Sequence, residues 1–171
     1  MTAATGDRVR VMITVDVPIA EAFRVFTEEI DAWWRRGRRF RHDRADRGVI
    51  RLEPGVGGRL FEEFARGRRT IVVETGKVTT WEPPRRLAFE WRIANFAPGE
   101  VTYVEVDFVE RGPRTEVTVV HRGWAAIRPD HPARHGEPPP RFLRTMGLWW
   151  GDLLGSLRAR ATTPASGATT R

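Results

Sequence analysis

The chain has 171 residues, a formal net charge of +7 and no cysteine, so it is long enough to bury a sizeable core in one domain and offers no disulfide or thiolate chemistry. Its longest apolar runs extend over only a few residues, which excludes a membrane-spanning helix, and Met1–Arg10 has no apolar stretch that could direct secretion. We therefore expect a cytoplasmic protein with no membrane span.

Arginine supplies almost all of the positive charge, because Lys77 is the only lysine. A basic excess can indicate nucleic acid or an acidic partner. An arginine bias of this kind is also what a genome-wide codon preference produces, and basic clusters alone are weak evidence. We therefore do not expect nucleic acid to be the partner.

Two periodicities predict the first elements. Arg8–Val17 carries valine or isoleucine at the odd-numbered positions from 9 to 17, which predicts a half-buried strand. Pro18 suits the first turn of a helix, and apolar residues at helical spacing extend that amphipathic helix to about Thr27. A second short helical piece is predicted over Glu28–Trp34.

The middle of the chain predicts an antiparallel sheet. Short runs with strand composition are separated by turns rich in glycine and proline, and consecutive strands joined by short turns favour antiparallel pairing. The expected strands are Gly48–Glu53, Arg59–Phe64, Thr70–Trp81, Leu87–Ile93, Val101–Val109 and Thr115–Gly123.

The C-terminal part predicts a loop followed by a long helix. Residues 125–140 contain three consecutive prolines and form the loop, whereas Arg141 to about Arg160 carries an apolar stripe about one third of the helix wide. We place one α+β domain at 8–161, with residues 1–7 flexible and the Thr/Ala/Ser/Gly-rich residues 162–171 disordered.

Three glycines, Gly147, Gly151 and Gly155, line up beside this apolar stripe. A glycine inside a helix costs about 1 kcal/mol relative to alanine, so the line needs a reason. Either the helix closely approaches another backbone there, or the glycines leave space for a ligand.

Aromatic residues are a second signal, with seven tryptophans against one tyrosine. Rings of this size with a polar N–H line many ligand pockets, but they also fill ordinary cores. We expect a mixture, in which some tryptophans fill the core and others line a cavity.

His121 is the best single polar candidate, because it shares a strand face with Val117 and Val119. An inward histidine could hydrogen-bond a ligand or act as an acid or base, although a lone histidine on an apolar face is more often a satisfied core residue. Glu74 would face inward in the same way and would need a partner such as Arg59, since an unpaired buried charge is costly.

His131 and His135 have the i, i+4 spacing of metal ligands on a helix. The neighbouring prolines and Gly136 argue against a helix here, so we expect no metal site, and no motif predicts a cofactor.

The run Arg35–Arg51 holds eight arginines. Its default interpretation is a solvated basic loop, and the alternative is a cationic mouth that draws in an anionic ligand.

Four stretches of the chain, within about residues 9–157, form a recognisable pattern. They are the valines before Pro18 with Ala22-Phe23, Phe26-Thr27-Glu28 and Trp33-Trp34; Pro54-Gly55-Val56-Gly57-Gly58-Arg59 with Phe61-Glu62; Gly76-Lys77-Val78 with Trp81-Glu82-Pro83-Pro84-Arg85-Arg86-Leu87-Ala88-Phe89-Glu90-Trp91; and Thr115-Glu116-Val117-Thr118 with His121-Arg122-Gly123-Trp124. Together they resemble the SRPBCC, or START-like, superfamily, and within it the heat-shock protein 90 ATPase activator-like domains.

The resemblance implies a helix-grip fold. In that fold a curved antiparallel sheet wraps around a long C-terminal α-helix, two short helices follow the first strand, and a cavity lies between sheet and helix. Members of the superfamily include lipid and hormone binders, aromatic polyketide cyclases and co-chaperone domains. No catalytic motif of the cyclases is recognisable, so no catalytic residue is carried over.

We expect the protein to bind a small apolar or amphipathic ligand in that cavity. One alternative is a cyclase- or dehydratase-like enzyme acting on an aromatic or polyketide-type substrate, with His121 and Glu74 or Glu63 as acid–base groups. Another is a module that contacts a chaperone. The oligomeric state stays open, a homodimer included. The residues expected at the cavity are Trp33, Trp34, Phe40, Phe61, Glu63, Glu74, Val78, Phe89, Trp91, His121, Met146, Trp150, Gly151 and Leu154.

Overall fold

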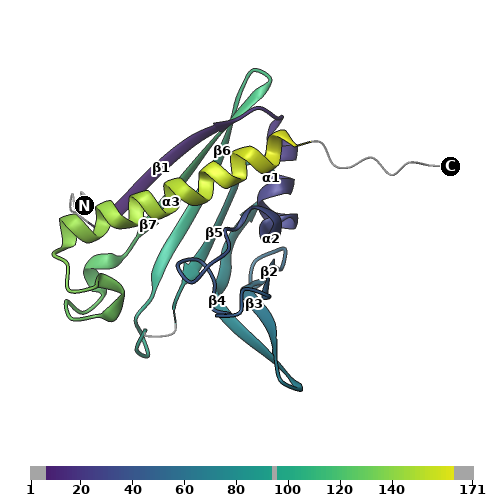
Figure 1. The fold of residues 1–171 in the computed structure, drawn as a ribbon. Helices are drawn as coiled ribbons and strands as arrows, with labels where there is room; N and C mark the ends of the chain where they lie inside the picture. The colour runs from purple at the N-terminus through teal and green to yellow at the C-terminus, as the bar shows by residue number, and fades with distance from the viewer. Residues whose placement is uncertain (1–6, 94–95, 164–171) are drawn as a thin grey trace.

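The computed structural model describes residues 7–93 and 96–163. Strands, three α-helices and two short 3-10 turns follow one another along this part of the chain (Figure 1). The bounds are β1 Arg8–Val15, α1 Ile19–Glu28, α2 Ile30–Trp33, β2 Val49–Leu52, β3 Arg59–Arg66, β4 Arg69–Glu82, β5 Arg86–Trp91, β6 Thr102–Arg111, β7 Arg114–Arg122, the 3-10 turns Trp124–Ala126 and Pro132–Arg134, and α3 Pro139–Thr162.

The seven strands form one antiparallel sheet in the order β1-β7-β6-β5-β4-β3-β2. The first strand therefore pairs with the last one, and the remaining strands are paired in chain order. The sheet curls around α3, which crosses its concave face, while α1 and α2 lie towards the C-terminal end of α3 (Figure 1). The expected α+β helix-grip fold is confirmed.

The first turn of the chain shows how local chemistry sets the element bounds. Strand β1 ends at Val15, two residues earlier than predicted, and the carbonyl of Val17 instead accepts a hydrogen bond of 2.8 Å from the Thr115 hydroxyl. Pro18 is the N-cap of α1, and its carbonyl accepts from the Ala22 amide at 2.9 Å. Since proline has no N–H to lose, it suits this position.

The core lies between α3, α1 and the concave face of the sheet. Trp150, Leu153, Leu154 and Leu157 on α3 are each at most 1% exposed. The ring of Phe26 on α1 is fully buried among aromatic neighbours of the same core. Full burial of such a side chain contributes about 1.5–3 kcal/mol, so these residues contribute strongly to holding α3 against the sheet.

Strand β4 carries two irregularities that the alternation of its sequence does not reveal. Its pairing with β3 shifts at Leu60/Phe61, which leaves Thr75 as an extra residue, and its pairing with β5 shifts between Val78 and Thr80. A bulge reverses which side chains face the core. Glu74 is therefore exposed although it has the parity of the buried Val78, and Thr75 is buried in its place.

Both predicted flexible ends fall largely outside the described residues. Residues 1–6 and 164–171 are not described, so the flexibility expected there stays a prediction; Thr162, expected in the tail, instead ends α3. Among the helices that the structure describes, none is both long and apolar enough to cross a membrane.

The glycines of β4 and α3 generate opposite predictions for a single added methyl group. A Cβ on Gly76 would clash directly with the backbone of Glu90 on the neighbouring strand, whereas one on Gly151 would meet nothing within 4 Å. We expect Gly76→Ala to lower the free energy of unfolding by at least about 2 kcal/mol through overpacking. We expect Gly151→Ala to raise it by up to about 1 kcal/mol through helix propensity. Urea denaturation of both variants checks this, and equal effects would contradict it.

Candidate functional site

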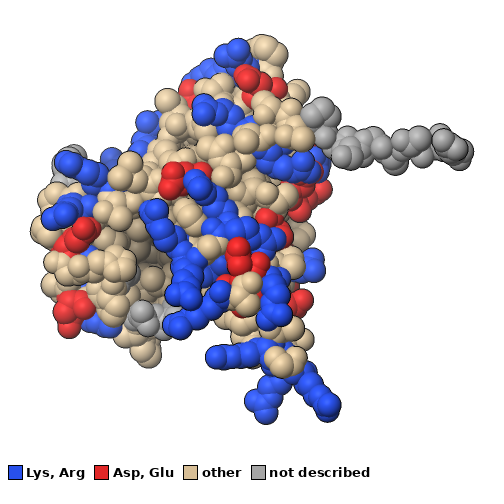
Figure 2. Space-filling model, in the orientation of Figure 1, with Lys and Arg blue, Asp and Glu red and all other residues tan. Residues whose placement is uncertain are grey.

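A pocket of about 460 Å³ opens beside the N-terminal half of α3. Its walls come from the sheet, from α3 and from segment 35–47, the stretch that joins α2 to β2. Figure 2 shows a hollow in this face of the molecule. The apolar residues lining the pocket are Trp34, Phe40, Ile50, Leu60, Phe61, Trp91, Ile93, Trp124, Phe142, Met146 and Trp149.

Four of these rings form one continuous aromatic wall. Trp34 stacks with Trp91, with centroids 6.0 Å apart, and Phe40 stacks with Trp149 at 5.5 Å. Trp149 also meets Trp34 and Trp91 edge-on, at 5.9 Å and 5.7 Å. The rings come from segment 35–47, β5, α3 and the end of α2, so four separate parts of the chain converge on this wall.

Hydrogen bonds hold two of these indoles in place. The N–H of Trp34 donates to the carbonyl of Phe40 at 3.0 Å, and the N–H of Trp149 donates to the carbonyl of Arg39 at 2.8 Å. The second bond ties α3 to segment 35–47 across the mouth of the pocket. Because both polar atoms are satisfied, the faces of these rings are left as apolar surface.

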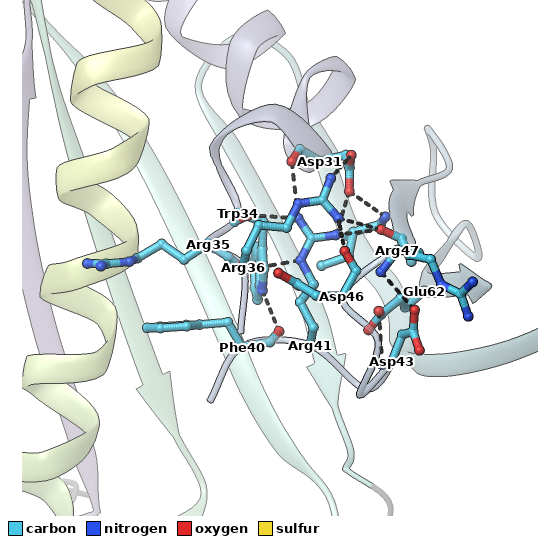
Figure 3. A network of polar contacts seen from close by, with 12 residues as sticks. Asp31, Trp34, Arg35, Arg36, Phe40, Arg41, Asp43, Asp46, Arg47 and Glu62 are labelled. Atoms are coloured by element: carbon cyan, nitrogen blue, oxygen red, sulfur yellow. Dashed lines mark hydrogen bonds and ion pairs between the residues drawn. The ribbon is translucent and has the colours of Figure 1, made fainter. Parts of the chain in front are cut away.

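Arg41 is the anchor of segment 35–47. Its side chain is fully buried and donates to the Asp31 carboxylate at 2.5 Å, to the carbonyls of Trp34 and Gly48 at 2.7 Å and 3.1 Å, and to two further carbonyls nearby (Figure 3). Burial alone would raise the pKa of Asp31, but the Ile50 amide and Arg41 together lower it. Because all of its donors are occupied by these groups, Arg41 holds segment 35–47 in position.

Glu62 is a buried carboxylate on the pocket wall, only 1% exposed. Its two oxygens accept from the backbone amides of His42 and Asp43, at 2.6 Å and 3.1 Å. Burial lowers the pKa of His42, and the negative charge of Glu62 opposes that shift. Segment 35–47 is thus fastened near its middle to β3, and both carboxylate oxygens of Glu62 are engaged by backbone amides.

His121 lies outside the pocket, in a buried chain of hydrogen bonds. Its Nδ1 accepts from the Trp150 indole at 3.1 Å, and its Nε2 lies 2.8 Å from the Thr102 hydroxyl. That hydroxyl itself donates to the carbonyl of Trp91 at 3.1 Å, so Nε2 must carry the proton and the ring is neutral. Burial lowers the pKa of His121 to about 3. Its role here is that of a satisfied core histidine.

The structure separates the predicted cavity residues into three groups. The first group lines the pocket and consists of Trp34, Phe40, Phe61, Trp91 and Met146. The second is buried in the core away from it and consists of Trp33, Val78, Phe89, His121, Trp150 and Leu154. The third lies half-buried or exposed outside the pocket and consists of Glu63, Glu74 and Gly151.

Strand and helix geometry explain the third group. Glu74 is displaced to the outer face by the bulge at Thr75, and Glu63 follows the inward Glu62 on β3 and therefore points the other way. Gly151 lies on the exposed side of α3, so space beside it is solvent. Of the glycine line, Gly147 alone would bring a Cβ close to a neighbour, 3.2 Å from Val9.

Sequence reasoning missed several lining residues, above all Glu62 and Trp149. Trp149 adjoins the buried Trp150 on the helix, and a wider apolar arc could have included it. No sequence pattern indicates that Glu62 is buried at the pocket, because its burial depends on hydrogen bonds from backbone amides of segment 35–47. Within the described residues, no group of three His, Asp or Glu side chains could hold a metal ion.

A known family model matches most of the chain. The family model described as "Activator of Hsp90 ATPase homolog 1-like protein" matches residues 16–146. A comparison with curated proteins gives no match.

Solved structures resemble the chain at low sequence identity. DynU16, a protein of the dynemicin biosynthetic locus, is 22% identical with a TM-score of 0.61; the match covers 92% of this chain but only 48% of that one. An HSP90 activator from Plasmodium falciparum is 15% identical, with a TM-score of 0.59 and coverage of 93% and 99%. The Aha1 dimer from Colwellia psychrerythraea is 15% identical, with a TM-score of 0.60 and coverage of 94% and 98%. At these identities the likeness establishes the fold alone.

The neutral state of His121 makes stability depend on pH. The pKa of the folded residue is about 3, against an ordinary 6.5, so below pH 6.5 the unfolded chain gains a proton that the folded chain does not. We expect this residue alone to reduce the free energy of unfolding by up to about 1.4 kcal/mol per pH unit between those two values.

Urea denaturation of the wild type and of His121→Gln between pH 7 and pH 4 isolates that contribution. The wild type should lose stability more steeply on acidification, even if the variant is less stable at pH 7. Identical slopes in the two proteins would contradict the assignment of a buried neutral histidine.

Proposed function

Because this chain belongs to the family of Activator of Hsp90 ATPase homolog 1-like proteins, with a helix over a curved sheet and an open pocket between them, we propose that it binds a small apolar or amphipathic molecule in that pocket. The observation that carries the proposal is the aromatic wall of Trp34, Phe40, Trp91 and Trp149. The indole N–H groups of Trp34 and Trp149 are engaged in hydrogen bonds, ring contacts hold the four side chains together, and all four line the pocket.

Size and composition support binding of a small molecule. A volume of about 460 Å³ lies within the range of about 300–1,000 Å³ that is usual for ligand pockets, which are mostly apolar with a few polar groups. Apolar surface removed from water contributes about 25 cal/mol per Å². A rigid wall adds affinity, because few side chains lose freedom when the ligand enters.

An enzymatic role has weaker support. Its expected acid–base groups are His121 with Glu63 or Glu74, and none of the three lines the pocket. Glu62 does line it, but both of its oxygens accept backbone hydrogen bonds. The likeness to a protein of the dynemicin locus is one of fold, and a shared fold does not carry a reaction with it.

A chaperone partner is the other alternative, since similar folds occur in HSP90 activators. Such a contact would use an outer surface and would not depend on the pocket.

We further propose that the protein acts in the cytoplasm. A homodimer is the assembly to test first, because the similar Aha1 from Colwellia psychrerythraea is described as a dimer.

Two tryptophan substitutions on α3 test the pocket. Thr145 lines it, whereas Leu148 on the same helix is 67% exposed. We expect Thr145→Trp to fill the pocket and to weaken binding of the neutral fluorescent probe N-phenyl-1-naphthylamine by at least about tenfold, equivalent to about 1.4 kcal/mol. Leu148→Trp adds the same ring outside and should leave binding unchanged.

Native mass spectrometry of the purified proteins extends this test to the natural ligand. A small apolar mass that accompanies the wild type and Leu148→Trp but not Thr145→Trp would support the proposal. Equal probe affinity in all three proteins would contradict it. Co-purification of a chaperone with all three would favour the interaction module instead.

A further inference from the structure

The charged residues that line the pocket differ in whether their side chains already have polar partners. Besides two histidines, the charged residues that line it are Arg38, Arg39, Arg41 and Glu62. Arg41 is buried and spends its donors on the Asp31 carboxylate and on backbone carbonyls. Glu62 is buried and accepts from two backbone amides. Both charges therefore serve the structure of the pocket wall.

Arg38 and Arg39 differ from Arg41 in both exposure and partners. Both are exposed at the mouth of the pocket, and within the described part of the chain neither guanidinium has a carboxylate within ion-pair distance. Their neighbours are paired, Arg35 with Asp152 at 3.5 Å and Arg36 with Asp31 at 3.2 Å. Arg44 and Arg47, further along the segment, likewise have no ion pair among the described residues, but they do not line the pocket. Arg38 and Arg39 are therefore the unpaired arginines of the segment that face it.

Arg39 also contacts the aromatic wall. Its guanidinium carbon lies 5.6 Å from the centroid of Phe40, the ring that stacks on Trp149. The backbone carbonyl of Arg39 is held by the Trp149 indole. A cation at the edge of an apolar wall is suited to a ligand with an apolar body and an anionic end.

The surface supports the same arrangement. Figure 2 shows Lys and Arg side chains gathered along the side of the hollow where segment 35–47 lies in Figure 1. With a formal net charge of +7 for the whole chain, the field around this mouth attracts anions and raises their rate of encounter.

We propose, resting on the binding function proposed above, that the ligand is an acidic amphiphile, whose apolar body lies against the aromatic wall and whose anionic oxygen group is held by Arg38 and Arg39. A guanidinium presents parallel N–H donors that match the oxygens of a carboxylate or a phosphate. Desolvation beside the aromatic rings strengthens this contact relative to one in open water. The arginines therefore select for the charged end, and the rings select for the body.

A matched pair of probes separates the charge from the apolar body. 8-Anilino-1-naphthalenesulfonate is N-phenyl-1-naphthylamine with one added sulfonate, and both fluoresce more strongly in apolar sites. The variant Arg38→Gln with Arg39→Gln removes the two cations at the mouth. The control variant Arg68→Gln with Arg69→Gln removes two exposed cations from the β3–β4 hairpin, which does not line the pocket.

We expect the double variant at Arg38 and Arg39 to weaken binding of the sulfonate probe by at least about tenfold, which is the loss of one or two charge-assisted hydrogen bonds. Its affinity for the neutral probe should stay within about twofold, which also shows that the pocket remains folded. The control variant should bind both probes like the wild type.

Other results would overturn the inference in distinguishable ways. If the wild type binds neither probe, the pocket function itself fails and this inference with it. If the neutral probe binds but the sulfonate affinity is unchanged in the double variant, or falls equally in the control, binding stands and recognition of an anion by Arg38 and Arg39 is wrong.

Competition against the neutral probe identifies the anionic group. 2-Naphthoate and 2-naphthyl phosphate should each displace the neutral probe from the wild type better than 2-naphthylmethanol does. The stronger of the two competitors shows whether the site prefers a carboxylate or a phosphate. Equal displacement by the uncharged alcohol would overturn the proposal.

Discussion

A buried chain of hydrogen bonds fixes where the long helix meets the sheet, and the rest of the molecule is arranged around that point. The indole of Trp150 on α3 donates to His121 on β7, His121 donates to Thr102 on β6, and Thr102 donates to the carbonyl of Trp91 at the end of β5. Each link satisfies the polar group of the next, so the contact is favourable only when all four are in register. Towards the C-terminus of α3 leucines fill the space above the sheet, and towards its N-terminus the pocket opens.

Segment 35–47 turns that opening into a walled pocket. Arg41 binds the middle of this segment to Asp31 and Trp34 at α2, and Glu62 binds the next two backbone amides to β3 (Figure 3). A buried arginine with five acceptors and a buried glutamate with two donors make the loop part of the fold. Phe40, carried on this loop, can then stack on Trp149 and complete the aromatic wall. Stability and the proposed binding function share these residues.

The sequence predicts the fold well and the site only in part. Alternation of valines, proline and glycine at the turns, and one amphipathic stripe predict the strands, the helices and the antiparallel pairing of consecutive strands. The curved sheet around α3 is implied by the family resemblance, and the pairing of β1 with β7 is not predicted. The aromatic wall is harder to predict from sequence, because adjacent tryptophans such as Trp149 and Trp150 differ only in which side of the helix they occupy. Glu74 shows the limit most clearly: parity places it inside, and a one-residue bulge places it outside. Nor can the sequence tell Arg41, which is buried, from Arg38 and Arg39, which are not.

Nuclear magnetic resonance of the seven tryptophan indole N–H groups tests the central claim, that an apolar ligand enters the pocket beside α3, most directly. Trp34, Trp91, Trp124 and Trp149 line the pocket, whereas Trp33, Trp81 and Trp150 do not. On titration with N-phenyl-1-naphthylamine, signals of the lining indoles should shift in a saturable way while those of the other three stay nearly constant. Shifts confined to the non-lining indoles, or no saturable shift at all, would contradict it.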